Sequence, residues 1–157
     1  LGTIGGKRTY RWFRRDYIRE VPNLYKYKVF ISKADGASGQ IGKPIPARII
    51  GTPVVEEPEV ACTETFISIG NFDSKYDADA CLKYLKCKFA RAMLGILKIT
   101  QDNTAVKWKY VPLQDFTSSS DIDWSKSIHE IDLQLYKKYY LDKKEIEFIE
   151  TYVKEMV

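Results

Sequence analysis

The segment Phe66-Ile-Ser-Ile-Gly-Asn-Phe-Asp73 and the helical pattern after it decide the fold of this chain. The segment has the composition and length of a strand, and Asp73 or Ser74 can cap a helix that begins directly after it. The apolar residues that follow recur at helical spacing and form one side of a helix: Ala78, Cys81, Leu82, Leu85, Phe89, Ala92, Met93 and Ile96. We therefore predict a strand followed by one long helix over 74–98.

Further strands and helices are predicted on both sides of this unit. Alternation over Tyr25–Ser32, the runs 52–55 and 64–70, and the apolar residues of Trp108–Val111 predict short strands. After a polar linker, Ser127 with Glu130 and Asp142 with Glu145 have the spacing of capping boxes, which predicts two more helices.

These elements together predict an α+β fold. We expect a curved, mostly antiparallel sheet around one long helix, followed by a C-terminal helical hairpin packed on the β-rich part. Residues 1–116 would form the first part and residues 121–157 the hairpin.

The charge of the chain is mild but unevenly distributed. The 157 residues are 45% hydrophobic and 13% aromatic, which is enough to bury a core, and 25 basic against 21 acidic residues give a net charge of +4. Before residue 20, six basic residues that alternate with aromatic ones face only Asp16: Lys7, Arg8, Arg11, Arg14, Arg15 and Arg19. A basic face attracts phosphates through a term that depends on salt and not on sequence, so nucleic acid is the first partner to suspect.

Cysteine spacing, hydropathy and the first residue indicate the cellular compartment and whether the chain is part of a longer protein. Cys62, Cys81 and Cys87 have no metal-ligand spacing and form no CxxC pair, which is typical of reduced thiols in a cytoplasmic protein. No apolar run approaches the ~18 residues that a membrane helix needs. Because the sequence begins at Leu1 without Met, we expect a piece of a longer protein.

Catalytic groups are sparse in this sequence. The only histidine, His129, lies in a helix-capping segment, and Gly5-Gly6-Lys7-Arg8 lacks the Ser or Thr that follows the lysine of a phosphate-binding loop. Glu59 with Asp73-Ser-Lys75 fits the degenerate signature of metal-dependent nucleases, although Asp73 serves equally well as a helix cap. We therefore expect no catalytic centre in this chain and keep a metal-dependent nuclease domain as an alternative.

Polar and basic residues on loops and on the long helix form a candidate DNA-binding set. Amide and hydroxyl side chains suited to base edges are Ser38, Gln40, Gln101 and Asn103. Basic residues that could hold phosphates are Arg8, Arg11, Lys33, Arg48, Lys83, Lys88, Arg91, Lys98, Lys107 and Lys109. The same residue types are also typical of a solvated helix face and of ordinary turns.

Five segments carry a resemblance to a known family. They are Thr65-Phe-Ile-Ser-Ile-Gly-Asn-Phe72, Leu82-Lys-Tyr-Leu-Lys-Cys-Lys-Phe-Ala-Arg91, Leu97-Lys-Ile-Thr-Gln-Asp-Asn103, Trp108-Lys-Tyr-Val-Pro-Leu-Gln-Asp-Phe116, and Ile122-Asp-Trp-Ser125 with Ile131-Asp-Leu-Gln-Leu-Tyr136. They resemble the C-terminal target-recognition domain of bacterial type II restriction-modification proteins that carry an adenine-specific DNA methyltransferase. More distantly, the chain is similar to the specificity subunits of type I systems.

This resemblance implies sequence-specific recognition of double-stranded DNA. The family's Asn-Pro-Pro-aromatic tetrapeptide and its glycine-containing S-adenosylmethionine motif do not occur here. The resemblance therefore implies that this chain recognises the target and binds no cofactor. A methyltransferase domain of the same parent would use S-adenosylmethionine, with Mg²⁺ where the parent also cleaves DNA. A protein-interaction module of the same system is a further alternative.

Overall fold

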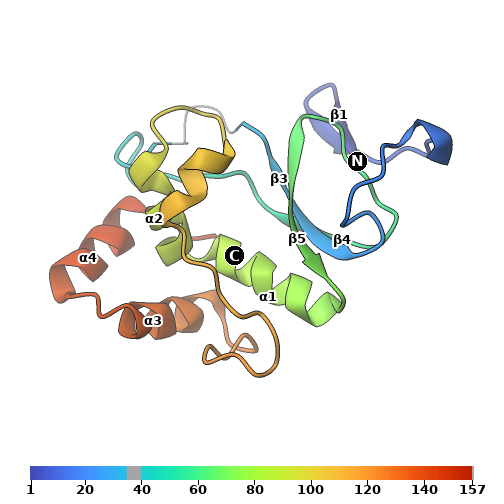
Figure 1. Ribbon diagram of the computed structural model, residues 1–157. Helices are drawn as coiled ribbons and strands as arrows, with labels where there is room; N and C mark the ends of the chain where they lie inside the picture. Colours follow the sequence, from blue (N-terminus) through green and yellow to red (C-terminus); the bar gives the residue numbers. More distant parts are fainter. Residues whose placement is uncertain (35–39, 157) are drawn as a thin grey trace.

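The computed structural model describes residues 1–34 and 40–156 and has an α+β architecture (Figure 1). A two-stranded hairpin joins β1 (Gly2–Ile4) and β2 (Lys7–Thr9), and a three-stranded sheet has the order β4-β3-β5. Its strands are β3 (Tyr27–Ser32), β4 (Val54–Glu56) and β5 (Phe66–Phe72), and both pairings are antiparallel. The expected α+β class and the antiparallel pairing are confirmed.

Gly70 creates an irregularity in the pairing of β3 with β5. The register shifts between Tyr27 and Val29 of β3, opposite Gly70, whose φ is +87°. A Cβ atom on Gly70 would lie 2.0 Å from the Phe72 ring, so both the backbone angle and the ring require glycine. This bulge brings the end of β5 into the turn that leads to the first helix.

The predicted long helix is two helices. Ser74 caps α1 (Lys75–Lys86) by accepting the Asp77 N–H, as predicted, but the helix ends at Cys87, whose ψ of 142° is extended. A second helix, α2, then covers Lys88–Leu97. The prediction of one helix over 74–98 was wrong because the break depends on a distant side chain. The Asp132 carboxylate accepts the backbone N–H groups of Lys88 at 3.0 Å and Phe89 at 2.9 Å.

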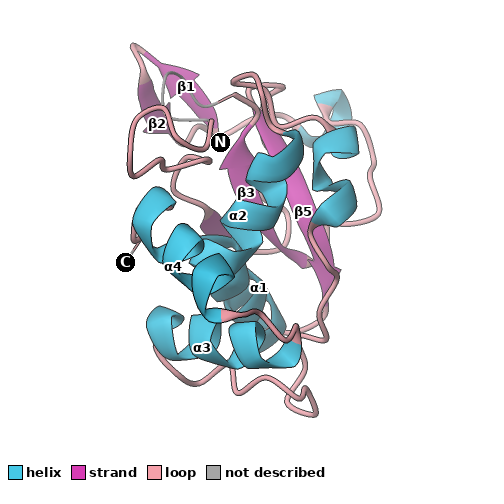
Figure 2. Cartoon of the chain, turned by 90° about the vertical axis from the view of Figure 1, so that its left-hand side faces the viewer, coloured by secondary structure: helices cyan, strands magenta, loops and turns pink. Residues whose placement is uncertain are grey.

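Two helices follow in the C-terminal part, α3 (Ile128–Lys138) and α4 (Lys143–Tyr152). Both predicted capping boxes are present, Ser127 with Glu130 and Asp142 with Glu145. α3 packs against α1 and α2, and α4 packs against α2, so these helices lie on other helices and not on the sheet (Figure 2). The expected packing of this helical hairpin on the β-rich part is therefore not confirmed.

The segment predicted as a strand over Trp108–Val111 is instead part of a 3₁₀ helix, η2 (Ala105–Tyr110), which packs on α2. A short apolar run does not distinguish a strand from a helical turn, and here no strand pairs with the run. A shorter 3₁₀ helix, η1 (Arg15–Tyr17), interrupts the N-terminal segment.

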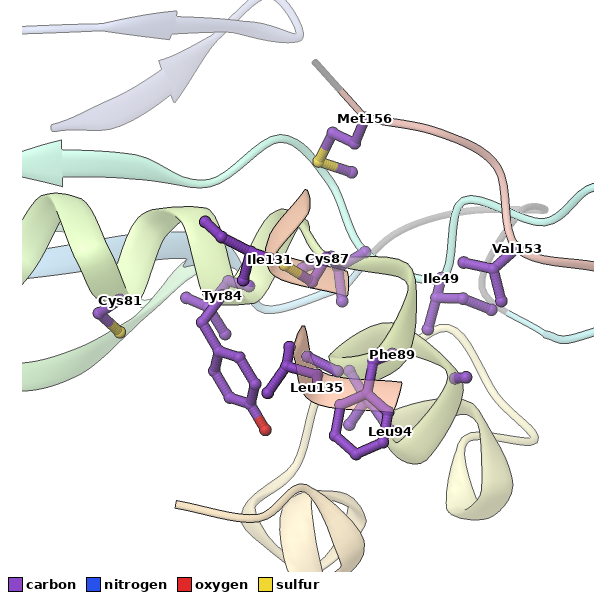
Figure 3. Close-up of a cluster of buried hydrophobic side chains, with 14 of the residues drawn as sticks. Ile49, Cys81, Tyr84, Cys87, Phe89, Leu94, Ile131, Leu135, Val153 and Met156 are labelled. Carbon is purple, nitrogen blue, oxygen red and sulfur yellow. The ribbon is translucent and has the colours of Figure 1, made fainter. Parts of the chain in front are cut away.

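One apolar core joins the three-stranded sheet to the helices, and β1, β2 and η1 contribute no side chain to it among the described residues. Buried side chains of α1, α2 and α3 meet there with Ile49 and Val153 from the flanking segments (Figure 3). Within the part of the chain that the structure describes, no helix has the length and apolar character to cross a membrane.

Candidate functional site

The basic residues predicted on the helices contact the protein itself. Lys83 Nζ donates to the backbone carbonyls of Trp124, Ser125 and Lys126 at 2.8, 3.3 and 2.9 Å. Lys88 Nζ forms an ion pair with Glu150 at 2.6 Å. Both side chains thereby fasten the C-terminal part of the chain to the central helices.

Two other cations of this set, Arg91 and Lys98, are buried and contact the protein interior. Arg91 is 1% exposed and donates to the Lys86 carbonyl, at the end of α1, and to the Arg48 carbonyl. Lys98 is 0% exposed and donates to the Ile49 carbonyl. Burial lowers the pKa of Arg91 to about 10. The break at Cys87 precedes Arg91, so the pattern of a single helix does not describe where this side chain lies.

Five of the predicted residues belong to neighbouring segments at one end of the sheet: Arg8, Lys33, Gln101, Asn103 and Lys107. An isolated antiparallel bridge pairs Ala34 with Asp102, and the Asn103 N–H donates to the Lys33 carbonyl at 2.7 Å. Lys107 Nζ donates to the Asp102 carbonyl at 2.7 Å, which fixes the turn before η2. The loop 98–104 therefore lies against the end of β3.

Not all loop amides in this set are accessible. Asn103 is 2% exposed, and its Nδ2 donates to the Ser32 carbonyl at 2.9 Å. Gln101 and Gln40 are exposed, and Gln40 pairs with Lys43 in an isolated bridge. Ser38 lies outside the described residues. Among the predicted base readers that are described, Gln40 and Gln101 present exposed side chains.

A cleft of about 520 Å³ lies between the N-terminal hairpin and the ends of β3 and β5. Two cations, Arg8 and Lys33, line it together with two acids, Glu64 and Asp102. The charges of the described lining residues are balanced, so these residues alone give a phosphate little electrostatic attraction.

The positive charge of the molecule is concentrated in residues 7–19, which we call the N-terminal arm. The arm has six basic residues and one acid; the totals of 25 basic and 21 acidic residues leave nineteen and twenty for the rest of the chain. Every residue from 10 to 17 is exposed, and Trp12 is fully so. The arm lies on the side of the sheet away from α3 and α4 (Figure 1).

Contacts at its start anchor the arm to the sheet. Arg8 Nη2 donates to the Thr52 carbonyl at 2.5 Å, and its guanidinium lies 5.6 Å from the centre of the Phe66 ring. The Tyr10 hydroxyl donates to the Glu56 carboxylate, and burial, followed by this hydrogen bond, raises the pKa of Tyr10 to about 12. The hydrogen bond therefore persists through the physiological pH range.

Further along the arm, two arginines have internal partners. Arg14 pairs with Asp16 at 2.6 Å and lies over Tyr17, whereas Arg15 pairs with Glu20 at 2.6 Å and lies over Tyr25. Within the described part of the chain, the exposed side chains of Lys7, Arg11 and Arg19 have no such contact. These three cations, with Trp12 and Phe13, remain available to a ligand, and the alternation of bases and aromatics was the sequence signal for them.

The groups considered for catalysis are separated or shielded. Asp73 pairs with Lys26 and Lys75 pairs with Asp79, so the predicted nuclease signature is divided between two surface ion pairs. Over residues 1–34 and 40–156, no group of three or more His, Cys, Asp or Glu side chains could hold a metal ion. Burial raises the pKa of Cys81 to about 12 and raises the pKa of Cys87 as well, which keeps both thiols protonated.

The comparisons with known proteins are negative: the chain matches no protein-family model, no curated protein and no solved structure. The resemblance to target-recognition domains therefore stays a prediction.

Proposed function

We propose that this chain recognises duplex DNA and serves as the specificity domain of a restriction-modification methyltransferase or endonuclease. The N-terminal arm holds the phosphate backbone, and exposed loop amides contact base edges. The catalytic steps belong to other domains of the parent protein. The proposal rests on the sequence resemblance and on the physical properties of two surfaces.

The single observation that carries the proposal is the charge of the arm. The rest of the chain has one more acid than base, so an approaching polyanion is drawn to residues 7–19. Arg11 and Arg19 present exposed guanidinium groups, which bind phosphate oxygens in a bidentate manner. These contacts would set position and orientation without selecting a sequence.

Selection of a sequence requires donors and acceptors that reach the base edges. Gln101 and Gln40 are exposed on two loops, and glutamine forms a bidentate pair with adenine in the major groove. Gln101 lies next to Asp102, which lines the same cleft as Arg8, the residue that anchors the arm. The two functions would thus be performed by adjoining surfaces.

The salt dependence of binding tests the proposal. The affinity for a fluorescent duplex, measured by anisotropy between 50 and 200 mM salt, should fall steeply, because each phosphate contact contributes about 0.9 to the slope of log K against log salt. In the double variant Arg11→Ala/Arg19→Ala, the magnitude of this slope should be smaller by about two. An affinity independent of salt would contradict the proposal and favour the protein-interaction alternative.

A matched control distinguishes the effect of where the cations lie from the effect of the total charge of the chain. Lys143→Ala/Lys144→Ala removes two exposed cations from the first turn of α4, on the opposite side of the molecule from the arm (Figure 1), and should leave the slope unchanged. If both double variants change the slope equally, only net charge matters and the arm is not the interface. A single strand of equal length should bind less tightly. Tighter binding of the single strand would mean that bases stack on Trp12 and Phe13, which contradicts duplex recognition.

A further inference from the structure

A second pocket of about 480 Å³ lies between β5, α1 and η2. Its walls are the inner face of β5, through Ile67 and Ile69, the Tyr84 and Leu85 side chains of α1, and Trp108 of η2. The segment Val111–Leu113 and Phe116 complete the wall. None of the described residues that line this pocket is charged, and its volume lies in the range of small-molecule sites.

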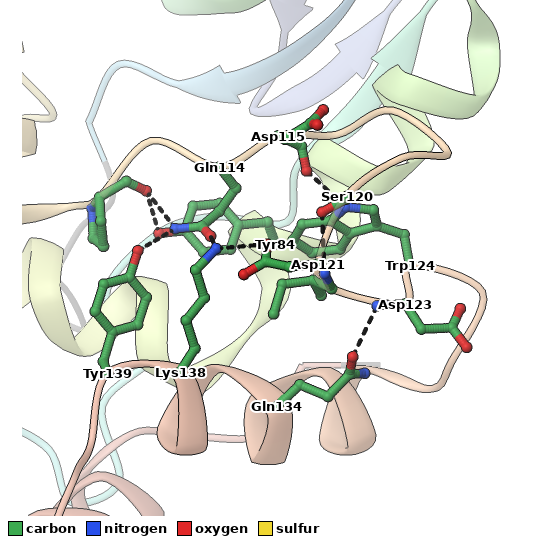
Figure 4. Close-up of polar contacts among 12 residues, drawn as sticks. Tyr84, Gln114, Asp115, Ser120, Asp121, Asp123, Trp124, Gln134, Lys138 and Tyr139 are labelled. Carbon is green, nitrogen blue, oxygen red and sulfur yellow. Dashed lines mark hydrogen bonds and ion pairs between the residues drawn. The ribbon is translucent and has the colours of Figure 1, made fainter.

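Hydrogen bonds fix the wall of the pocket. The Tyr84 hydroxyl donates to the Pro112 carbonyl at 2.7 Å, and Gln114 Nε2 donates to the same carbonyl at 3.1 Å. Gln114 is itself held by Tyr139 at 2.8 Å and by Lys138 at 2.9 Å (Figure 4). The segment that closes the pocket is thus fastened to α1 and α3, so a ligand meets a preformed site.

One buried polar atom at this pocket is unsatisfied. Asn103 forms part of the wall, is 2% exposed, and its Oδ1 has no hydrogen-bond partner among the described residues. Its orientation is fixed because Nδ2 donates to the Ser32 carbonyl, which an oxygen in that place would repel. A buried acceptor without a donor is unfavourable, and a ligand that brings a donor would satisfy it.

We propose that this pocket binds an uncharged, planar aromatic molecule that carries an N–H donor. The absence of charged side chains from its lining disfavours an ion, and Trp108, Tyr84 and Phe116 offer aromatic surface to a planar ring. Asn103 Oδ1 accepts the N–H hydrogen bond. Two sources have this chemistry: a free heterocycle, and an unpaired amino-bearing base in a nucleic acid.

A pair of matched probes tests the hydrogen bond without altering the protein. Indole carries an N–H donor, and 1-methylindole has the same ring system without one. In NMR titrations of the full chain, indole should shift the backbone signals of Ile67, Leu85 and Trp108 and the side-chain amide of Asn103. The 1-methylindole affinity should be about tenfold weaker, the loss expected for one unsatisfied hydrogen bond. Equal affinities, or shifts confined to other parts of the chain, would overturn the proposal.

Two neighbouring substitutions test the location. Ala105 lines the pocket and is exposed, whereas Val106 is exposed and does not line it. Ala105→Phe should fill the pocket and abolish indole binding. Val106→Phe should bind indole with the same affinity as the unaltered chain. Retention of binding by Ala105→Phe would refute the assignment.

A final comparison identifies the source of the ligand. Adenine, its N6,N6-dimethyl analogue, and duplexes with and without one unpaired adenine are titrated in parallel. Signal changes at Leu85 with the bulged duplex alone identify a base as the natural occupant, and changes with free adenine identify a free heterocycle. Failure of all these probes and of indole overturns the proposal while leaving duplex binding by the arm unaffected.

Discussion

Asp132 supplies the N-terminal cap of α2, which the residues next to this helix do not provide. Cys87, at the N-terminus of α2, makes no side-chain cap, and the Asp132 carboxylate of α3 accepts the first N–H groups instead. The carboxylate is 2% exposed, and burial raises its pKa to about 6, against the opposing effect of these two donors and of Arg91. A residue 45 positions after Cys87 thus determines where one helix ends and the next begins.

This carboxylate predicts an unusual pH dependence. Because its folded-state pKa lies above its unfolded value, the stability that it contributes is fully present below pH 3.8 and is lost as the pH rises through about 6. Asp132→Asn cannot ionise. Relative to the unaltered chain, this variant should gain about 2 kcal/mol in free energy of unfolding between pH 4 and pH 7, measured by urea denaturation. If the difference in unfolding free energy between Asp132→Asn and the unaltered chain stays constant with pH, or changes in the opposite direction, the pKa of Asp132 is not raised.

The central helices illustrate, at the scale of elements, why a basic residue on a predicted helix does not identify a ligand site. Helical periodicity identified the helical region and its buried face, and the local capping signals identified α3 and α4. Periodicity does not show that Lys83 donates to a turn 41 residues later, or that Arg91 closes the end of α1. Such contacts depend on tertiary packing, which local patterns do not encode.

We therefore expect Lys83 to act in stability and not in DNA binding. Lys83→Met retains the apolar stem but leaves the Trp124, Ser125 and Lys126 carbonyls without their donor. It should lower the free energy of unfolding by about 1–3 kcal/mol and leave duplex affinity at low temperature unchanged. Lys144→Met, which removes an exposed lysine of α4, is the control for charge. If duplex affinity falls in Lys83→Met and not in Lys144→Met, while stability is unchanged, Lys83 belongs to the proposed DNA interface.

At the scale of the whole molecule, composition indicated a basic N-terminal segment, and the structure adds its exposure and its place on the sheet. The sequence did not predict the hairpin whose second strand, β2, begins the arm, although Gly5 and Gly6 have positive φ angles of 54° and 76° and permit the turn between β1 and β2. It also gave no indication of the apolar pocket, because the described residues that line it are separated by up to 49 positions, from Ile67 to Phe116. The charge of a segment can be counted from its own residues, whereas a pocket forms only when distant segments pack together.

The proposed function predicts that phosphate contact and base selection are separable. Gln101→Ala removes an exposed amide beside the arm and should relax discrimination at one base pair by about 1–3 kcal/mol, with little effect on other sites. Arg11→Ala should instead weaken binding to all duplexes alike, because guanidinium contacts with phosphate carry no sequence information. Selection from a randomised duplex library, followed by affinity measurements on the recovered sequences, compares both variants with the unaltered chain. If Gln101→Ala weakens every sequence equally, loop 98–104 only supports the fold, and base selection must come from another surface such as the loop that carries Gln40.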